Sequence, residues 1–182
     1  MGLAIDYQRE DEMYIITAEI AKLPKESSET ASPLILTGRG RKLTSALKDI
    51  ELQTSGILYY QHAVLMVFGE EMLRVGIQPI VSHFMQPASV QKTMQTAAVK
   101  NGKGADLFTV KANTEDFLSK ELVQVIKKKC HKHEGELYLL YNDIPAGEVD
   151  KLPLIAIEQK GDDKKAKLDG FIEVKHGTVQ QS

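Results

Sequence analysis

The sequence predicts a mixed α/β (α+β) fold, in which helices flank a mixed β-sheet and a smaller helical subdomain is attached. Near the N-terminus, two short runs alternate between apolar and polar residues, which is typical of paired strands. Residues 63–68 (AVLMVF) are apolar on both faces of a pleat, which is typical of a strand covered on both sides. Segments with apolar residues at helical spacing separate these runs, so the expected strands are joined by helices.

Strands are expected where short apolar or alternating runs are bounded by turn residues. Residues 3–7 and 14–20 should form a β-hairpin through the polar segment 8–12, although that segment has no Asn-Gly or Asp-Gly pair. The polar residues 24–33 predict a surface loop. The further strands predicted by the same signals are residues 34–36, 63–68, 93–99, 152–159 and 171–174.

Helices are expected where apolar residues recur at i, i+3 and i+4. One such pattern covers residues 43–50, and Gly38 and Gly40 before it are expected to break the preceding strand as a plain turn. After residues 63–68, a short helix should break at Gly76, and a second helix should stop at Pro87.

The clearest helix is predicted to be capped by Asn113 or Thr114, with acidic residues in its first turn. Lysines 127–129 stand in its last turn, where the helix dipole favours positive charge. Its apolar face is formed by Leu118, Leu122, Val125 and Ile126. Residues 136–142 predict a further helix.

The order of these elements predicts how the chain is divided. Residues 1–108 together with 151–182 are expected to form a mixed α/β sheet domain, and residues 109–150 a helical subdomain or insertion. Two hairpin turns are candidates near the C-terminus, and we favour His176-Gly177 over Asp169-Gly170.

Composition excludes several classes of protein. The chain has 182 residues, 42% hydrophobic and 26% charged, which is enough to bury a core without disulfides; Cys130 is the sole cysteine. A net charge of −2 argues against a nucleic-acid partner. The longest apolar run, residues 63–68, is far shorter than the roughly 20 residues of a membrane span. We recognise no signal peptide after Met1.

Two short motifs invite a site, and both fit poorly. Residues 38–42 (GRGRK) resemble a phosphate loop but match neither of its specific glycine patterns, so a plain turn is preferred. Cys130, His131 and His133 suggest zinc, yet a second ligand pair at the required spacing is missing. The basic end of a helix explains this segment better, and we predict no metal and no cofactor.

The remaining candidates are Tyr60 and His62, which precede the buried run 63–68. His62 is a candidate general base, but no nucleophile motif accompanies it. We therefore predict no catalytic residues and retain Tyr60 and His62 as candidate binding residues. Asp6 is a lone carboxylate, which is expected to cap or pair locally rather than to form an acid–base pair.

An ordered set of segments resembles one known family. These are GLAIDY at 2–7, the strand at 14–20, LYYQH at 58–62, AVLMVFGEE at 63–71, GADL at 104–107 and KLDGF at 167–171. Together they are similar to the N-terminal region of the Ger(x)C family, the lipoprotein C subunits of nutrient germinant receptors in endospore-forming bacteria. The lipid-bearing cysteine and the large C-terminal domain of that family have no counterpart in this sequence.

The resemblance implies a non-enzymatic role in spore germination. It implies a peripheral, lipid-anchored location at the spore inner membrane for the full-length protein, with the A and B membrane subunits of the receptor as partners. The lipid anchor would lie outside this chain. A scaffold or signalling module that works through protein contacts is the function we expect.

Three alternatives stay open at this point. One is a small-molecule domain that binds the nutrient directly, and another is a small α/β enzyme using His62. The third is a zinc-binding module centred on Cys130. The basic segment 39–48 is compatible with anionic lipid, but an ordinary solvated surface explains it better.

Overall fold

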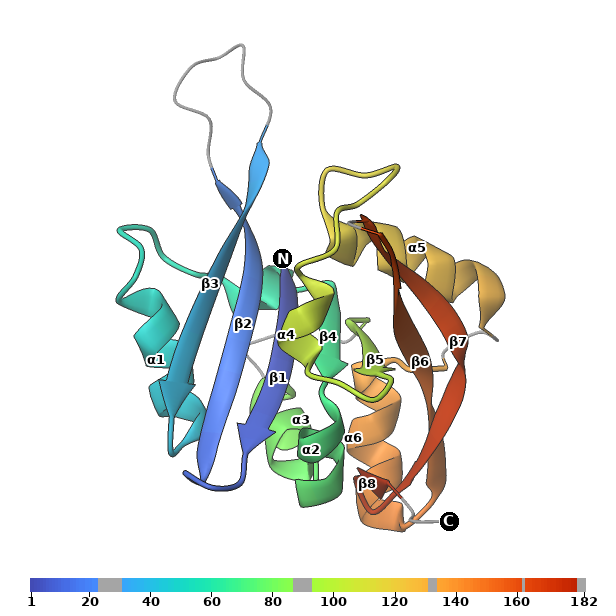
Figure 1. Ribbon diagram of the computed structural model, residues 1–182. Helices are drawn as coiled ribbons and strands as arrows, with labels where there is room; N and C mark the ends of the chain where they lie inside the picture. The colour runs from blue at the N-terminus through green and yellow to red at the C-terminus, as the bar shows by residue number, and fades with distance from the viewer. Residues whose placement is uncertain (23–30, 87–92, 131–133, 162, 180–182) are drawn as a thin grey trace.

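The computed structural model describes residues 1–22, 31–86, 93–130, 134–161 and 163–179, except for the side chain of Gln61. Among these residues, eight strands form one sheet in the order β3-β2-β1-β4-β5-β6-β7-β8 (Figure 1). The strands are β1 (Gly2–Gln8), β2 (Met13–Lys22), β3 (Ser32–Gly40), β4 (Leu65–Phe68), β5 (Gln95–Val99), β6 (Val149–Lys160), β7 (Asp163–Lys175) and β8 (Thr178–Val179). Residues 24–30 of the predicted loop and the predicted stop at Pro87 lie outside this part of the chain.

The centre of the sheet is parallel and its two sides are antiparallel. β1, β4, β5 and β6 run in the same direction. β2 and β3 continue the sheet beyond β1, and β7 and β8 continue it beyond β6, with antiparallel pairing throughout. The predicted hairpin of the first two strands is confirmed, and β4 is buried along its whole length, as its apolar sequence predicts. The predicted mixed sheet is therefore confirmed.

Helices cover both faces of the sheet. They are α1 (Leu43–Glu51), the 3₁₀ turn η1 (Tyr60–His62), α2 (Glu70–Val75), α3 (Gln78–Phe84), α4 (Gly104–Leu107), α5 (Leu118–Lys129) and α6 (Leu137–Ala146). Buried side chains of α1, α2, α3 and α6 join Leu3 and Ile5 in one apolar cluster. Those of α4 and α5 join Ala4 in the other, because neighbouring residues of a strand point to opposite faces. None of the helices described is long and apolar enough to cross a membrane.

The prediction that Gly38 and Gly40 break the third strand is wrong. Both glycines lie inside β3 and pair with β2. They are needed there because α1 crosses the strand closely: a Cβ atom on Gly38 would lie 2.2 Å from the carbonyl oxygen of Ala46, and one on Gly40 would lie 2.6 Å from the Ala46 nitrogen. The glycines therefore mark a close approach of helix and strand.

The predicted cap of the long helix is also wrong. α5 begins at Leu118, and the N–H groups of Asn113 and Thr114 instead donate to the carboxylate of Glu121, each at 2.7 Å. The acceptor at the start of α5 comes from β2, since the Glu19 carboxylate accepts from the N–H groups of Leu118 and Ser119. A distant strand therefore supplies the cap that the local sequence was expected to provide.

Other local predictions are confirmed. Gly76 ends α2 with a φ of 116°, which only glycine adopts readily. The chain reverses at His176-Gly177, after which β8 pairs with β7, whereas Asp169-Gly170 lies inside β7.

The division of the chain at residues 109–150 stays a prediction. Both helices of this segment pack on the sheet, and they do so on opposite faces. Leu122 of α5 belongs to the apolar cluster that contains Ala4, and Leu140 of α6 belongs to the cluster that contains Leu3.

Candidate functional site

The two candidate residues predicted from the sequence, Tyr60 and His62, lie together in η1 but face different surroundings. The Tyr60 hydroxyl donates to the carbonyl of Leu47 at 3.2 Å, and its ring packs edge-on against Phe84. Burial raises the pKa of Tyr60, and the nearby Glu51 carboxylate raises it further. Tyr60 therefore ties η1 to α1 and α3. His62 is exposed and contacts the ring of Tyr59 edge-on, with 6.0 Å between the ring centres.

The segment between α1 and η1 exposes large apolar side chains. Leu52 and Ile57 are each 76% exposed and Tyr59 is 52% exposed. A single exposed apolar residue is ordinary, but three stand within one connection next to His62, which makes this connection a candidate for contact with another molecule. We call residues 52–62 the exposed loop.

The two motifs that invited a zinc or a phosphate site, and for which the sequence favours a helix end and a turn, gain no support as sites. His131 and His133 lie outside the described residues, and Cys130 is partly buried, which raises the pKa of its thiol. Within the residues that the structure describes, no three His, Cys, Asp or Glu side chains are grouped to hold a metal ion. Gly38 to Lys42 is strand and bend under α1 rather than a loop around a phosphate.

An open cleft of about 890 Å³ lies on the face that carries α4. Its floor is the part of β2 and β3 that α4 and α5 leave uncovered. Strand register sets this floor, since Asp6 pairs with Ile15 and Ile15 pairs with Arg39, which puts the three residues in one row across β1, β2 and β3. In the next row the hydroxyls of Thr17 and Thr37 are 3.1 Å apart and share a hydrogen bond.

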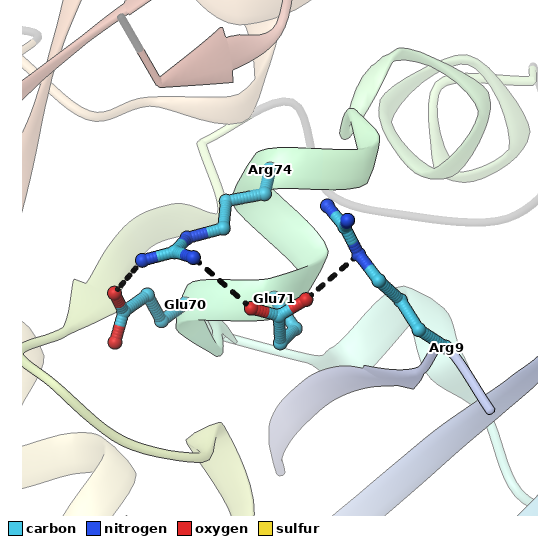
Figure 2. Close-up of polar contacts among 4 residues, drawn as sticks. All are labelled: Arg9, Glu70, Glu71 and Arg74. Atoms are coloured by element: carbon cyan, nitrogen blue, oxygen red, sulfur yellow. Dashed lines mark hydrogen bonds and ion pairs between the residues drawn. The ribbon is translucent and has the colours of Figure 1, made fainter. Parts of the chain in front are cut away.

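The rim of the cleft carries a network of ion pairs (Figure 2). Arg9, just after β1, contacts Glu71 at 2.9 Å, and Arg74 contacts Glu70 at 2.5 Å and Glu71 at 3.5 Å. All four side chains are well exposed, so each pair stabilises the fold by less than about 1 kcal/mol. The consequence for the cleft is electrostatic: both glutamates at the start of α2 already have cationic partners.

Asp6 closes the inner end of the cleft. Its two oxygens accept from the N–H groups of Gly104 at 2.7 Å and Ala105 at 2.9 Å, at the start of α4. Burial raises the pKa of Asp6, and these two donors oppose that shift. The prediction that Asp6 caps locally is wrong in one respect, because it caps a helix 98 residues further along the chain.

Sequence reasoning missed the cleft because it expected β3 to end before Arg39. Because β3 continues through Gly38 and Gly40, the alternation of Thr37 and Arg39 with these glycines indicates which face of the sheet each side chain occupies. It puts both polar side chains on the face opposite α1.

These features define a mixed-sheet domain with an open polar cleft and an exposed apolar loop, and comparison with known proteins gives its family. The model of the spore germination protein N-terminal domain matches residues 1–141. The chain therefore belongs to this family, and the resemblance to the N-terminal region of the Ger(x)C proteins is confirmed.

Two further comparisons add little. No curated protein matches the sequence significantly. A solved structure described as the crystal structure of the GerBC protein is similar over 98% of this chain and 50% of its own, with 18% identity and a TM-score of 0.46. The chain thus spans about half the length of that protein.

Proposed function

We propose that this domain is the N-terminal region of a membrane-anchored lipoprotein subunit of a nutrient germinant receptor, and that it acts in spore germination through protein–protein contacts. The observation that carries the proposal is the family match over residues 1–141. In the full-length protein, a lipid anchor would hold the domain at the surface of the spore inner membrane. The A and B membrane subunits of the receptor are its proposed partners, and its role is non-catalytic.

The exposed loop is the proposed contact surface. Interfaces place aromatic and large aliphatic side chains at their centre, surrounded by polar groups. Ile57 and Tyr59 are such side chains, and both are more than half exposed. Tyr60 anchors the loop through its hydrogen bond to Leu47, so the surface rests on a fixed support. In this proposal Tyr60 and His62 serve binding by shaping the loop.

Co-purification from solubilised spore membranes tests this role. Full-length protein with Ile57→Ser and Tyr59→Ser should recover several-fold less of the membrane subunits than the wild type, because the central apolar contacts are lost. The matched control is Val149→Ser at the start of β6, where the side chain is also 52% exposed. Equal recovery by both variants would show that the loop is not the interface. Failure of the wild type to recover either subunit would refute the proposed partners.

Direct nutrient binding is the second candidate, because the domain has a cleft large enough for a small molecule. The alternative of an enzyme that uses His62 has less structural support. His62 contacts Tyr59, and no contact between His62 and a carboxylate appears among the residues described.

A further inference from the structure

The cleft lies at a distinctive point of the sheet topology. β1 and β4 are adjacent and parallel, yet the chain leaves β1 toward β2 on one side and leaves β4 toward β5 on the other. In open α/β sheets, ligands bind beyond the carboxyl ends of the strands where neighbouring connections diverge in this way. The segments that follow β1, β4 and β5 contribute Arg9, Glu70 and Lys103 to the walls of the cleft.

The charges in the cleft are unevenly compensated. Four acidic residues line the cleft. Three of them already have partners: Asp6 accepts from two backbone N–H groups, and Glu70 and Glu71 form ion pairs with arginines. The fourth acidic residue is Glu10. Arg39 lies on the floor; its backbone N–H donates to the Asp49 carboxylate at 2.9 Å, and its guanidinium forms no ion pair with another residue that the structure describes. Lys103 lies at the wall, close enough to Asp6 to affect the pKa of that carboxyl.

Hydroxyl donors complete the floor. The Thr17 and Thr37 hydroxyls share a hydrogen bond in which either can donate. When the buried Thr17 donates, the hydrogen of the exposed Thr37 hydroxyl is left for a ligand. A guanidinium and a hydroxyl side by side on a rigid strand pair are the groups that bind carboxylate and phosphate oxygens. A cleft of about 890 Å³ has room for a metabolite-sized molecule.

We propose that this cleft binds a small molecule carrying a carboxylate or phosphate group, held by Arg39, Lys103 and the Thr37 hydroxyl. This site goes beyond the proposed contact role and lies on other elements than the exposed loop.

Titration of the ¹⁵N-labelled chain, followed by amide chemical shifts, tests the proposal. The probes are inorganic phosphate, malonate and citrate, with sodium chloride at matched ionic strength and glycerol as references. Saturable shifts at Thr37, Arg39 and residues 101–103 should appear with at least one acidic probe and with neither reference. Saturation by phosphate alone identifies a phosphate site, and saturation by malonate or citrate identifies a carboxylate site.

Two arginines provide a matched pair of variants. Arg39→Gln should weaken binding at least about five-fold, because it removes a charged two-pronged donor. Arg41→Gln removes the same charge just beyond β3, at a residue that does not line the cleft, and should leave affinity unchanged. Lys103→Gln is the second cleft variant should Arg39→Gln fail to fold.

The proposal is overturned if no acidic probe gives saturable shifts, or if Arg39→Gln and Arg41→Gln lose affinity equally. Neither result would bear on the contact role, because co-purification with the membrane subunits is measured on variants of the exposed loop. Conversely, loss of that interaction would leave the titration unchanged.

Discussion

Carboxyl groups join helices to the sheet in two regions of this domain; they are buried in the first region and half-buried in the second, and they meet different neighbours. On β1 and β2, the carboxyls of Asp6 and Glu19 each accept two backbone N–H groups at the start of a helix. At the other side, Asp150 at the start of β6 forms a hydrogen bond with Asp143, another carboxyl, near the end of α6.

The two settings differ in what the negative charge meets. Glu19 faces the N-terminus of α5, where unpaired N–H groups and the helix dipole favour an anion. Asp150 faces Asp143 and Glu148, and one of its oxygens is buried without a hydrogen-bond partner in the described part of the chain. Burial first, and then the hydrogen bond and charge of Asp143, raise the pKa of Asp150 to about 7. In the first arrangement the carboxyl oxygens accept from N–H groups at helix starts, whereas the second arrangement depends on keeping a proton.

Removal of the Glu19 cap should have the largest effect. Glu19→Ala leaves two buried N–H groups without an acceptor, so we expect the free energy of unfolding to fall by about 2–3 kcal/mol in urea denaturation. Glu19→Gln keeps one carbonyl acceptor and should lose roughly half as much.

Ser119→Ala is the control on the same turn of α5. The Ser119 hydroxyl is buried and has no hydrogen-bond partner among the residues that the structure describes, and the variant retains the N–H whose hydrogen bond Glu19 accepts. Its stability should therefore stay within about 0.5 kcal/mol of wild type or rise slightly. A loss from Ser119→Ala as large as that from Glu19→Ala would show that packing, and not the cap, explains both.

The Asp143–Asp150 pair should make stability depend on pH. Because the pKa of Asp150 in the folded state, about 7, lies above the ordinary aspartate value of 3.8, the folded state keeps a proton that the unfolded state releases between these values. Its stabilising effect is complete below about pH 4 and is lost as pH rises through about 7. Asp150→Asn removes this titration and can still donate to Asp143. Relative to wild type it should gain stability at pH 8, by no more than roughly 1 kcal/mol, since the site is partly screened by solvent.

Urea midpoints measured from pH 4 to pH 8 check this expectation. Asp163→Asn, an exposed residue at the start of β7, serves as the control and should follow the wild-type profile. Parallel profiles for wild type and Asp150→Asn would mean that the pair does not titrate in this range.

Local sequence patterns predicted the elements whose structure depends on local physics. Alternation predicted the hairpin, an unbroken apolar run predicted β4, and Gly76 predicted the break between α2 and α3. The family resemblance was likewise carried by short segments in order, and the family match over residues 1–141 confirms it.

The predictions that were wrong concern features that depend on residues far apart in the chain. Glu19 caps a helix 100 residues away, which no capping rule over neighbouring residues detects. Gly38 was predicted to break the strand, because its contact with α1 is not evident from the sequence. Since the strand was expected to end before Arg39, the position of Arg39 in the cleft was missed as well. Charge and glycine content alone do not reveal which residues of neighbouring strands lie opposite each other, because strand register is set by the pairing and packing of the whole sheet.

The contact role is tested most directly by photo-crosslinking in spores. Full-length protein carrying p-benzoylphenylalanine at Tyr59, in the exposed loop, should form an adduct with a receptor membrane subunit, while the same group at Val149, which is also 52% exposed, should not. No adduct from position 59, or equal adducts from both positions, would contradict the account.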